Sequence, residues 1–431
     1  MKKSKETAAK LKAFWRILGP GLVTGAADDD PSGIATYSQT GAQFGYGQLW
    51  TALYMLPLMT AVQEACARIG LVTGKDITTI VKRQYSRTVL YCVVGLVIIA
   101  NVINIGADLG AMASAAQLLV PVPFWILTLI FTIIILLLEI FTNYAVYSKI
   151  LKWLAITLLA YPITLFIVHQ PWGTILKASV IPHFEFSFAF FFIITGVLGT
   201  TISPYMFFWE ASQEVEEDKK RHLLKGDKPN ISRISVRRMR IDNTFGMIFS
   251  EFATWSIIVV SATVLHNSGV HDIRTAADAA KAIEPLVHSF PHAGLLSKII
   301  FSTGIIGLGM LAIPVLSGSA AYSVSAAFNW QASLNLKLNK AKGFYAVIIA
   351  ATVVGLLLNF IGIDPVKGLV YAAVLNGVAA VPLLFLVLKI SSDAKVMGEF
   401  KSGWISKSVL WITFIAMTAA AIAMFYTILK P

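Results

Sequence analysis

Three consecutive aspartates, Asp28, Asp29 and Asp30, lie inside a stretch that is otherwise apolar. One charged side chain at the centre of a bilayer costs about 2.5–3.5 kcal/mol on insertion scales, and adjacent carboxylates also repel one another. A bound cation is the simplest compensation, and a hard divalent ion suits oxygen ligands. Pro31 disfavours helix in Asp30 and Gly33 lets the chain turn, so backbone carbonyls become free beside the carboxylates. The alternative is a solvated cap at a membrane surface.

A second interruption, at residues 196–204 (GVLGTTISP), supplies hydroxyl groups instead of acids. Thr200, Thr201, Ser203 and Tyr205 surround its proline, and their oxygens together with freed carbonyls could complete an oxygen cage. A hydroxyl in a transmembrane helix more often bonds its own backbone, so a purely structural role for Thr201 fits the sequence equally well.

Further acids lie in apolar segments. Glu64 and Arg68 are four residues apart on one predicted helix, which favours a local ion pair. Glu251 lies about eleven residues into its segment with no basic residue one turn away, so we expect it to be the best additional acid for a cation pathway. Glu139 lies near a helix end, which fits an interfacial position. Glu210 and Glu214 share one helix face, which fits either an inner exit of the pathway or a solvated helix end equally well.

The elements that must position these residues are membrane helices. The chain has 431 residues, of which 56% are hydrophobic and 13% charged, whereas soluble domains carry about 25% charge. Apolar runs near the length needed to cross a hydrocarbon core of about 30 Å recur throughout. We predict one all-α polytopic domain of about eleven helices. The predicted spans are 18–40, 46–70, 88–119, 123–142, 148–169, 183–210, 241–266, 293–328, 344–363, 366–388 and 408–428.

The net charge of +12 is distributed asymmetrically. Most Lys and Arg residues fall in the N-terminal segment 1–17 and in the loops after the even-numbered spans. The opposite side holds Lys177, Arg274, Lys281, Lys298, Lys367 and Lys430. The positive-inside rule therefore predicts a multi-pass protein of the cell (inner) membrane with a cytoplasmic N-terminus and an external C-terminus. We interpret the basic excess as this orientation signal, with the lipid bilayer and not nucleic acid as the partner.

The two interruptions are five spans apart, an odd number, so the two halves would run in opposite senses. This predicts inverted repeats at 18–169 and 183–388, followed by an eleventh helix at 408–428. Inverted repeats that each start with a broken helix are a transporter architecture with its site at the midplane. Simple kinks at Pro and Gly are the alternative, but they do not explain the acids beside one break.

Motifs for covalent chemistry are absent from the sequence. It contains no GxxxxGK[ST], GxGxxG or HExxH pattern, and its seven His residues are scattered. We therefore expect no enzyme activity and no cofactor, with a metal ion as substrate. The polar loops at 211–240 (cytoplasmic, partly helical at its start, irregular near 226–230) and 267–292 (external, with a short helical centre) are too short for the signalling domain of a membrane receptor.

The segment ILGPGLVTGAADDDPSGIATYSQTGAQFGYGQLW, followed by ARIGLVTGKDI, resembles the opening of the NRAMP family of divalent metal transporters. The segment TTISPYMFFW falls where that family carries its second metal-binding segment. The helix count extends the resemblance over the whole chain. The resemblance implies the LeuT-like fold, with broken helices one and six, and transport by alternating access.

The first break departs from the family pattern. Members typically read Asp-Pro-Gly-Asn, whereas this chain reads Asp-Pro-Ser-Gly from Asp30 to Gly33. The resemblance implies that Asp30 is the metal-binding aspartate and that Ala27 contributes a carbonyl. It also implies that the asparagine ligand is lost to Gly33. We expect Asp29 and Glu251 to hold charge or water around the ion.

The second break departs further. Members typically read Met-Pro-His, and Ser203 and Tyr205 occupy the positions of the methionine and the histidine. The resemblance maps the second carbonyl ligand to Thr200. A thioether suits transition metals, so its replacement by a hydroxyl moves the site toward hard ions. We expect small Gly33 and Ser203 to leave room for a partly hydrated ion, with Mg²⁺ and Mn²⁺ transported and Ca²⁺ disfavoured, as in the NRAMP-related magnesium transporter branch.

Proton coupling is expected to be weak or absent. The family's third-helix acid pair becomes Asp108 and Ala111, and the basic residues expected on helix nine are missing from 344–363. One alternative is an ordinary proton-coupled Mn²⁺/Fe²⁺ carrier. Another is a LeuT-fold amino-acid carrier, although three aspartates would repel a substrate carboxylate. We expect a monomer.

Overall fold

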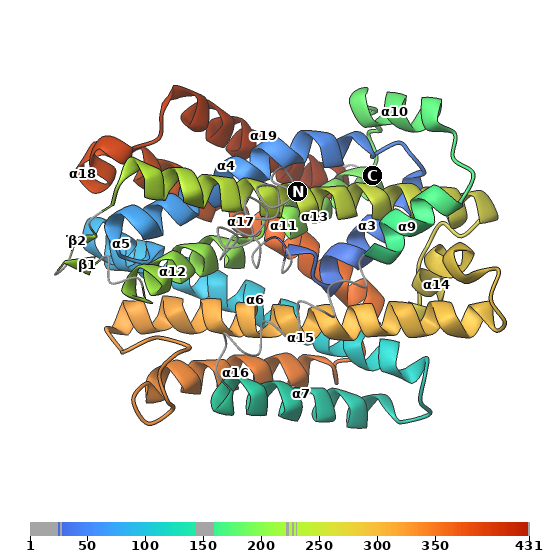
Figure 1. The fold of residues 1–431 in the computed structure, drawn as a ribbon, viewed down its shortest axis with the longest axis horizontal. Helices are drawn as coiled ribbons and strands as arrows, with labels where there is room; N and C mark the ends of the chain where they lie inside the picture. The colour runs from blue at the N-terminus through green and yellow to red at the C-terminus, as the bar shows by residue number, and fades with distance from the viewer. Residues whose placement is uncertain are drawn as a thin grey trace, which may run out of the picture.

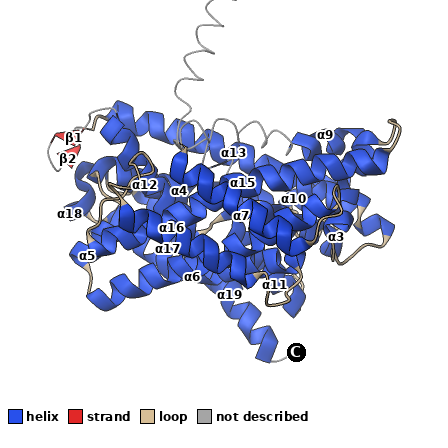
Figure 2. Ribbon diagram, turned by 90° about the horizontal axis from the view of Figure 1, so that it is seen from below, coloured by secondary structure: helices blue, strands red, loops and turns tan. Residues whose placement is uncertain are grey.

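The structure is a computed structural model, and it describes residues 25, 28–142, 159–220, 224–225, 228–229 and 231–429. The described chain is almost entirely helical (Figures 1 and 2). The helices of the predicted spans are α3 (Pro31–Phe44), α4 (Trp50–Thr73), α6 (Arg87–Gln117), α7 (Phe124–Phe141), α9 (Ala160–Ile167), α11 (Phe188–Thr201), α12 (Pro204–Lys220), α13 (Arg233–Val264), α15 (Ala293–Phe328), α16 (Lys342–Leu358), α17 (Pro365–Ser392) and α19 (Trp404–Leu429).

Every one of the eleven predicted spans thus contains described helix, which confirms the all-α class. Eight segments of the described residues are long and apolar enough to cross a membrane. The start of the first predicted span and residues 143–158, which include most of the fifth, lie outside the described residues. Shorter helical elements connect the spans: α5 (Ile77–Gln84), α10 (Trp172–Val180), η2 (His266–Ser268), α14 (Ala276–Ala280), η3 (Lys281–Val287), α18 (Ala394–Met397) and η4 (Gly398–Phe400).

Local sequence signals set the helix ends. Gly74 ends α4 in the left-handed region, at φ +63°, where a residue without Cβ is free of steric cost. Asp76 then caps α5, because its carboxylate accepts the Thr79 N–H at 2.8 Å. Ser86 caps α6 in the same way through the Val89 N–H at 3.3 Å. The chain therefore turns twice between two long spans at residues that the sequence marks clearly.

Both predicted helix breaks are present. The residues before α3 leave helical geometry at Asp29 and Asp30, and the helix begins at Pro31. The sixth span is divided into α11 and α12, with Ile202 and Ser203 outside either helix. In both places a proline starts the second half, because its fixed φ suits the first turn of a helix and it has no N–H to leave unbonded.

The loops partly correct the sequence interpretation. The connector 211–240 is shorter than expected, since α12 continues to Lys220 and α13 starts at Arg233. Where irregular chain was expected near 226–230, strands β1 (Leu224–Lys225) and β2 (Lys228–Pro229) form an antiparallel pair. The helical centre of the loop 267–292 is confirmed by α14 and η3.

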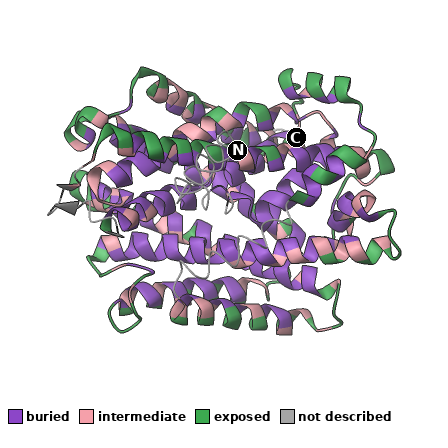
Figure 3. Ribbon diagram, in the orientation of Figure 1, coloured by how far each residue is buried: buried purple, intermediate pink, exposed green. Residues whose placement is uncertain are grey.

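Helix α3 lies in the interior, where it contacts α11, α13 and α17. Figure 3 shows the buried residues gathered on such central helices and the exposed residues on the outer helices and loops. Small residues allow the close approach: a Cβ on Gly41 would lie 2.3 Å from the Ile258 carbonyl of α13, and one on Gly199 would lie 2.2 Å from the Gly377 nitrogen of α17. Close packing of this kind holds membrane helices together where lipid removes the hydrophobic drive between them.

Candidate metal site at two helix breaks

Asp30 joins the broken chain to the start of α3. Its Oδ1 atom accepts the Gly33 N–H at 2.8 Å and the Ser32 hydroxyl at 2.6 Å. These bonds form a standard N-cap, which satisfies donors that the helix itself cannot. The side chain is buried, with 1% of its surface exposed. One carboxylate oxygen of Asp30 is therefore committed to the helix, and the other is directed elsewhere.

That second oxygen faces the other break. Oδ2 of Asp30 accepts the Tyr205 hydroxyl, from the first turn of α12, at 3.1 Å. The Thr200 hydroxyl, at the end of α11, lies 3.4 Å from that of Ser32. Ser203 lies within the break and is fully buried. The structure thus brings Asp30 to one junction with hydroxyl residues that lie 170 or more positions later in the sequence.

Thr201 does more than bond its own backbone. Its hydroxyl lies 2.9 Å from the hydroxyl of Tyr37 on α3. Both side chains are fully buried, so this bond links α3 to α11 within the protein interior. A structural role for Thr201 is therefore a link between helices, and tertiary contact rather than local sequence produces it.

Gly33 marks a close approach instead of open space. A Cβ built on it would lie 3.2 Å from the Thr200 hydroxyl oxygen and 3.2 Å from the Tyr37 ring. The expectation that Gly33 leaves room for a hydrated ion is therefore wrong for this conformation, because α11 and Tyr37 fill that side. A larger side chain at this position would push α3 away from α11.

Asp108 on α6 is a further acid at this junction. It is fully buried, neither of its carboxylate oxygens has a hydrogen-bond partner, and its charge repels that of Asp30. The sequence pattern did not place Asp108 among the site residues. The signal was available, because Asp108 is an acid in an apolar span with no basic residue one turn away, which is the criterion that selected Glu251.

The other two aspartates point away from Asp30 toward α13. The Ser250 hydroxyl donates to Asp28 at 3.0 Å, and the Thr254 hydroxyl donates to Asp29 at 3.5 Å. Glu251 on the same helix is buried, and its charge and that of Asp29 repel one another. The backbone explains this division, because it passes from helix at Asp28 to extended at Asp30, so successive side chains leave in different directions.

The triplet therefore does not converge as one three-carboxylate site. Among the described residues, no group of three or more His, Cys, Asp or Glu side chains could hold one ion. Among the described residues, no Lys or Arg forms an ion pair with Asp28, Asp29 or Asp30. Ala27, the expected source of a carbonyl ligand, lies outside the described residues.

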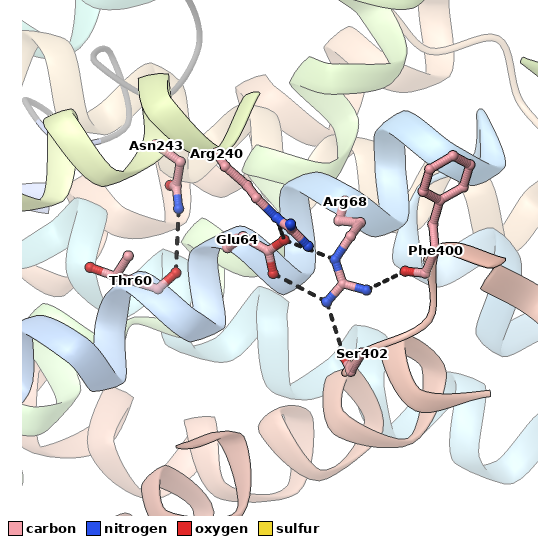
Figure 4. A network of polar contacts seen from close by, with 7 residues as sticks. All are labelled: Thr60, Glu64, Arg68, Arg240, Asn243, Phe400 and Ser402. Atoms are coloured by element: carbon pink, nitrogen blue, oxygen red, sulfur yellow. Dashed lines mark hydrogen bonds and ion pairs between the residues drawn. The ribbon is translucent and has the colours of Figure 1, made fainter. Parts of the chain in front are cut away.

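Glu64, by contrast, has cationic partners, which confirms the predicted ion pair (Figure 4). Arg68 donates to both of its oxygens, at 2.9 and 3.1 Å, and Arg240 of α13 donates at 2.8 Å. Arg68 also bonds the Phe400 carbonyl and the Ser402 hydroxyl. Glu64 is thus part of a structural network between α4, α13 and the segment before α19.

The remaining acids are buried in the protein. Glu139, two residues before the end of α7, is 5% exposed and accepts the Ser317 hydroxyl of α15 at 2.5 Å, so its carboxylate is covered by protein. Glu210 and Glu214 are both buried along α12, which excludes a solvated helix end for them.

Comparison with known proteins places these features in context. The family model described as "Natural resistance-associated macrophage protein-like" matches residues 21–427. The "Divalent metal cation transporter MntH" of Caldanaerobacter subterraneus subsp. tengcongensis is 26% identical over 397 residues, which cover 91% of this chain and 88% of that protein. The protein of the same name from Mesorhizobium japonicum is 26% identical over 308 residues, with 69% and 64% covered.

Solved structures support the fold. A manganese transporter of Eremococcus coleocola, in complex with an aromatic bis-isothiourea compound, superposes with a TM-score of 0.74 at 17% identity over 97% of this chain and 88% of that one. Mhp1, a nucleobase-cation-symport-1 family transporter, gives a TM-score of 0.56 at 14% identity, with 95% and 92% covered. These likenesses confirm the LeuT-like architecture.

Proposed function

Because the chain belongs to the Nramp family, whose members are membrane transporters and not enzymes, we propose that it carries divalent metal cations through the junction of α3, α11 and α12. One observation carries the proposal: the buried Asp30 carboxylate meets both helix breaks, and in the described chain no basic side chain pairs with it. A buried carboxylate without a protein cation is costly unless a bound ion compensates it.

The two oxygens of Asp30 have separate tasks in this mechanism. Oδ1 stays with the Gly33 N–H and keeps the start of α3 in place. Oδ2 holds only the neutral Tyr205 hydroxyl, which a cation can displace or which can turn toward a water bound to the ion. The Thr200 carbonyl lies in the last turn of α11, at the negative end of that helix, and Pro204 has no N–H to donate to it. The Thr200 carbonyl and Ser203 contribute oxygens around the ion, and the family resemblance implies the Ala27 carbonyl as a further ligand.

The ion preference follows from the donor set. The side chains that bond Asp30 present hydroxyl oxygens, from Ser32 and Tyr205, and Asp108 adds a second carboxylate nearby. Oxygen donors suit Mg²⁺ and Mn²⁺, and Mg²⁺ retains several waters that hydroxyl groups can bind. We therefore propose Mg²⁺ and Mn²⁺ as substrates. Ca²⁺ is disfavoured because it needs six to eight oxygen ligands at longer distance.

The ion crosses by alternating access, with the repeats 18–169 and 183–388 rocking around the junction. We propose that metal transport is weakly coupled to proton movement or not coupled to it. Tyr205 stands where the family resemblance leads us to expect a histidine, and Ala111 stands where it leads us to expect an acid. In this mechanism Asp29 and Glu251 hold charge beside the pathway. The proposed orientation has the N-terminus in the cytoplasm and the C-terminus outside.

The test uses purified protein in proteoliposomes with an internal dye for Mg²⁺ or Mn²⁺ and a second dye for pH. We expect Mg²⁺ and Mn²⁺ to enter without matched acidification, and Asp30→Asn to abolish entry. Asp272→Asn, an exposed loop acid, serves as the matched control and keeps wild-type rates. Equal transport by Asp30→Asn would overturn the site, and stoichiometric acidification would overturn the uncoupled mechanism.

The second candidate is a proton-coupled carrier of Mn²⁺ and Fe²⁺. It is favoured by the structural likeness to the manganese transporter of Eremococcus coleocola. Competition against Mn²⁺ uptake separates the two candidates. If the second holds, Fe²⁺ blocks Mn²⁺ uptake at a much lower concentration than Mg²⁺ does. If the first holds, Fe²⁺ and Mg²⁺ block it at comparable concentrations.

A further inference from the structure

Two histidines and a backbone carbonyl meet at the end of α3, far from the helix breaks. The Nδ1 atoms of His266 and His271 lie 3.2 Å apart. Each also faces the Ala42 carbonyl oxygen, at 2.8 Å for His266 and 3.3 Å for His271. The two rings stand at 72° with centroids 4.7 Å apart, so they are not stacked.

These three atoms have the spacing of ligands around one metal ion. Ligands at about 2.05 Å in a tetrahedral site lie about 3.3 Å from one another. For a triangle with sides of 2.8, 3.2 and 3.3 Å, a point about 2.05 Å from all three corners lies about 1 Å above its plane. An ion can therefore reach both imidazoles and the carbonyl with little movement of the protein, and water can occupy the fourth position.

The loop that carries the histidines is fixed to α3. The Gln39 side chain donates to the His271 carbonyl at 3.2 Å and accepts the Ile273 N–H at 2.9 Å. Gly45, at φ +55°, ends α3 beside the His266 ring, and a Cβ there would lie 3.3 Å from it. His271 is exposed and His266 half-buried, so the site is held in shape and open to solution.

We propose that His266, His271 and the Ala42 carbonyl form a binding site for a borderline transition-metal ion, with Zn²⁺ as the best fit. Imidazole nitrogen suits Zn²⁺ and its neighbours, whereas Mg²⁺ prefers oxygen. In the metal-free protein the nitrogen that bonds the Ala42 carbonyl carries a proton, because a carbonyl only accepts. Binding requires the other tautomer of that ring, in which Nε2 carries the proton and Nδ1 is free to hold the ion.

The site has a mechanical consequence for transport. Helix α3 begins at Asp30 and ends beside Ala42, and the histidines follow α13. An ion bound here ties the far end of α3 to the end of α13. Since α3 carries the capping aspartate of the transport junction, Zn²⁺ at the histidines slows transport. This consequence rests on the proposed function, but the binding site itself does not.

Binding is measured first, by titrating Zn²⁺ into purified protein that carries Asp30→Asn, so that the transport junction is silent. We expect one Zn²⁺ site, weakened by more than about tenfold in His266→Ala and in His271→Ala. His288→Ala removes an exposed histidine of the same loop and leaves affinity unchanged. Unchanged affinity in both His266→Ala and His271→Ala would overturn the site.

Spectroscopy then counts the ligands. Cu²⁺ bound in place of Zn²⁺ reports its nitrogen ligands through hyperfine splitting in electron paramagnetic resonance. We expect two equivalent imidazole nitrogens in the Asp30→Asn protein and one in His271→Ala. A signal with one nitrogen before mutation would contradict the proposed site. Zn²⁺ inhibition of Mg²⁺ uptake, measured with and without His271→Ala, tests the mechanical consequence separately.

Discussion

Two groups of acids within the helix bundle, one partly buried and one fully buried, show how differently one protein can accommodate the same side-chain chemistry. Glu64 accepts hydrogen bonds from Arg68 and Arg240, and the network extends to the segment before α19. Among the described residues, Asp28 and Asp30 receive bonds only from neutral donors, and one buried oxygen of Asp28 has no partner there. The first group is complete without any ligand, whereas the second lacks positive charge.

The difference separates structural acids from acids that await a cation. A buried ion pair with good geometry compensates its own desolvation in part, so the protein gains little from adding an ion there. For acids whose only partners are hydroxyl groups and backbone N–H groups, the charged form keeps a large desolvation cost in an apolar environment, and a bound cation lowers that cost. The presence or absence of a basic partner, more than burial, therefore distinguishes Glu64 from Asp30.

The largest effect is expected from Asp30→Asn. The amide keeps the cap at α3 but removes the charge that holds the cation, so Mg²⁺ and Mn²⁺ uptake falls at least about 100-fold, to the level of empty liposomes. Thermal unfolding in detergent should show the variant folded and insensitive to added Mg²⁺. Retention of a metal-induced rise in melting temperature would remove Asp30 from the site.

Glu64→Ala is expected to lower stability by about 3 kcal/mol, because it leaves the Arg68 charge buried without its anion. The loss stays at the low end of the usual range since Arg68 keeps the Phe400 carbonyl and the Ser402 hydroxyl. Unfolding curves measure it. The double variant with Arg68→Met should recover most of the loss, and a double variant as unstable as the single one would contradict an interaction between the two.

Glu251→Gln should raise the stability of the metal-free protein and lower its affinity for Mg²⁺. Removing one of several mutually repelling acids raises the melting temperature of the metal-free protein. It also lowers Mg²⁺ affinity by roughly tenfold, as expected for a group that acts on the ion from a distance. Calorimetric titration and thermal unfolding on the same sample check both signs, and a fall in metal-free stability would show that Glu251 is compensated within the protein.

Tyr205→Phe tests how much one hydrogen bond to Asp30 contributes to transport. It removes the 3.1 Å bond to Asp30 without disturbing the buried ring. A neutral hydrogen bond contributes about 1 kcal/mol, so Mg²⁺ uptake should change by less than about tenfold. Initial rates over a range of Mg²⁺ concentrations test this, with Tyr426→Phe on the exposed face of α19 as the control. A complete loss of uptake would make Tyr205 a ligand in its own right.

The smallest effect concerns an acid outside the spans. Burial alone raises the pKa of Asp278, but hydrogen bonds from Thr275 and Lys281 bring that pKa below its usual value. Its stabilising contribution is present above the unfolded pKa and is lost as the pH falls through the lowered one. Because the partner Lys281 is 54% exposed and solvent screens the pair, Asp278→Asn should cost well under about 1 kcal/mol at neutral pH. The melting temperatures of the two proteins should converge as the pH falls below that lowered pKa.

Particular residues show how far sequence reasoning reached into the fold. The prolines at 31 and 204 and the apolar runs predicted the helix breaks and the spans, because both depend on local backbone chemistry and on the length of apolar segments. The spacing of Glu64 and Arg68 predicted their ion pair for the same reason. The site was predicted less completely: Asp108 was missed and the aspartate triplet was treated as one cluster.

The sequence alone determined that acids lie at a break in an apolar chain and that hydroxyl groups lie at another. Only the tertiary structure decided which side chains share a junction. The backbone between Asp28 and Asp30 changes conformation, so neighbours in sequence diverge toward α13 and α12. The approach of α3, α11 and α13 through small residues then fixes the contacts across distant segments, and helix packing of this kind depends on shapes that no local pattern encodes.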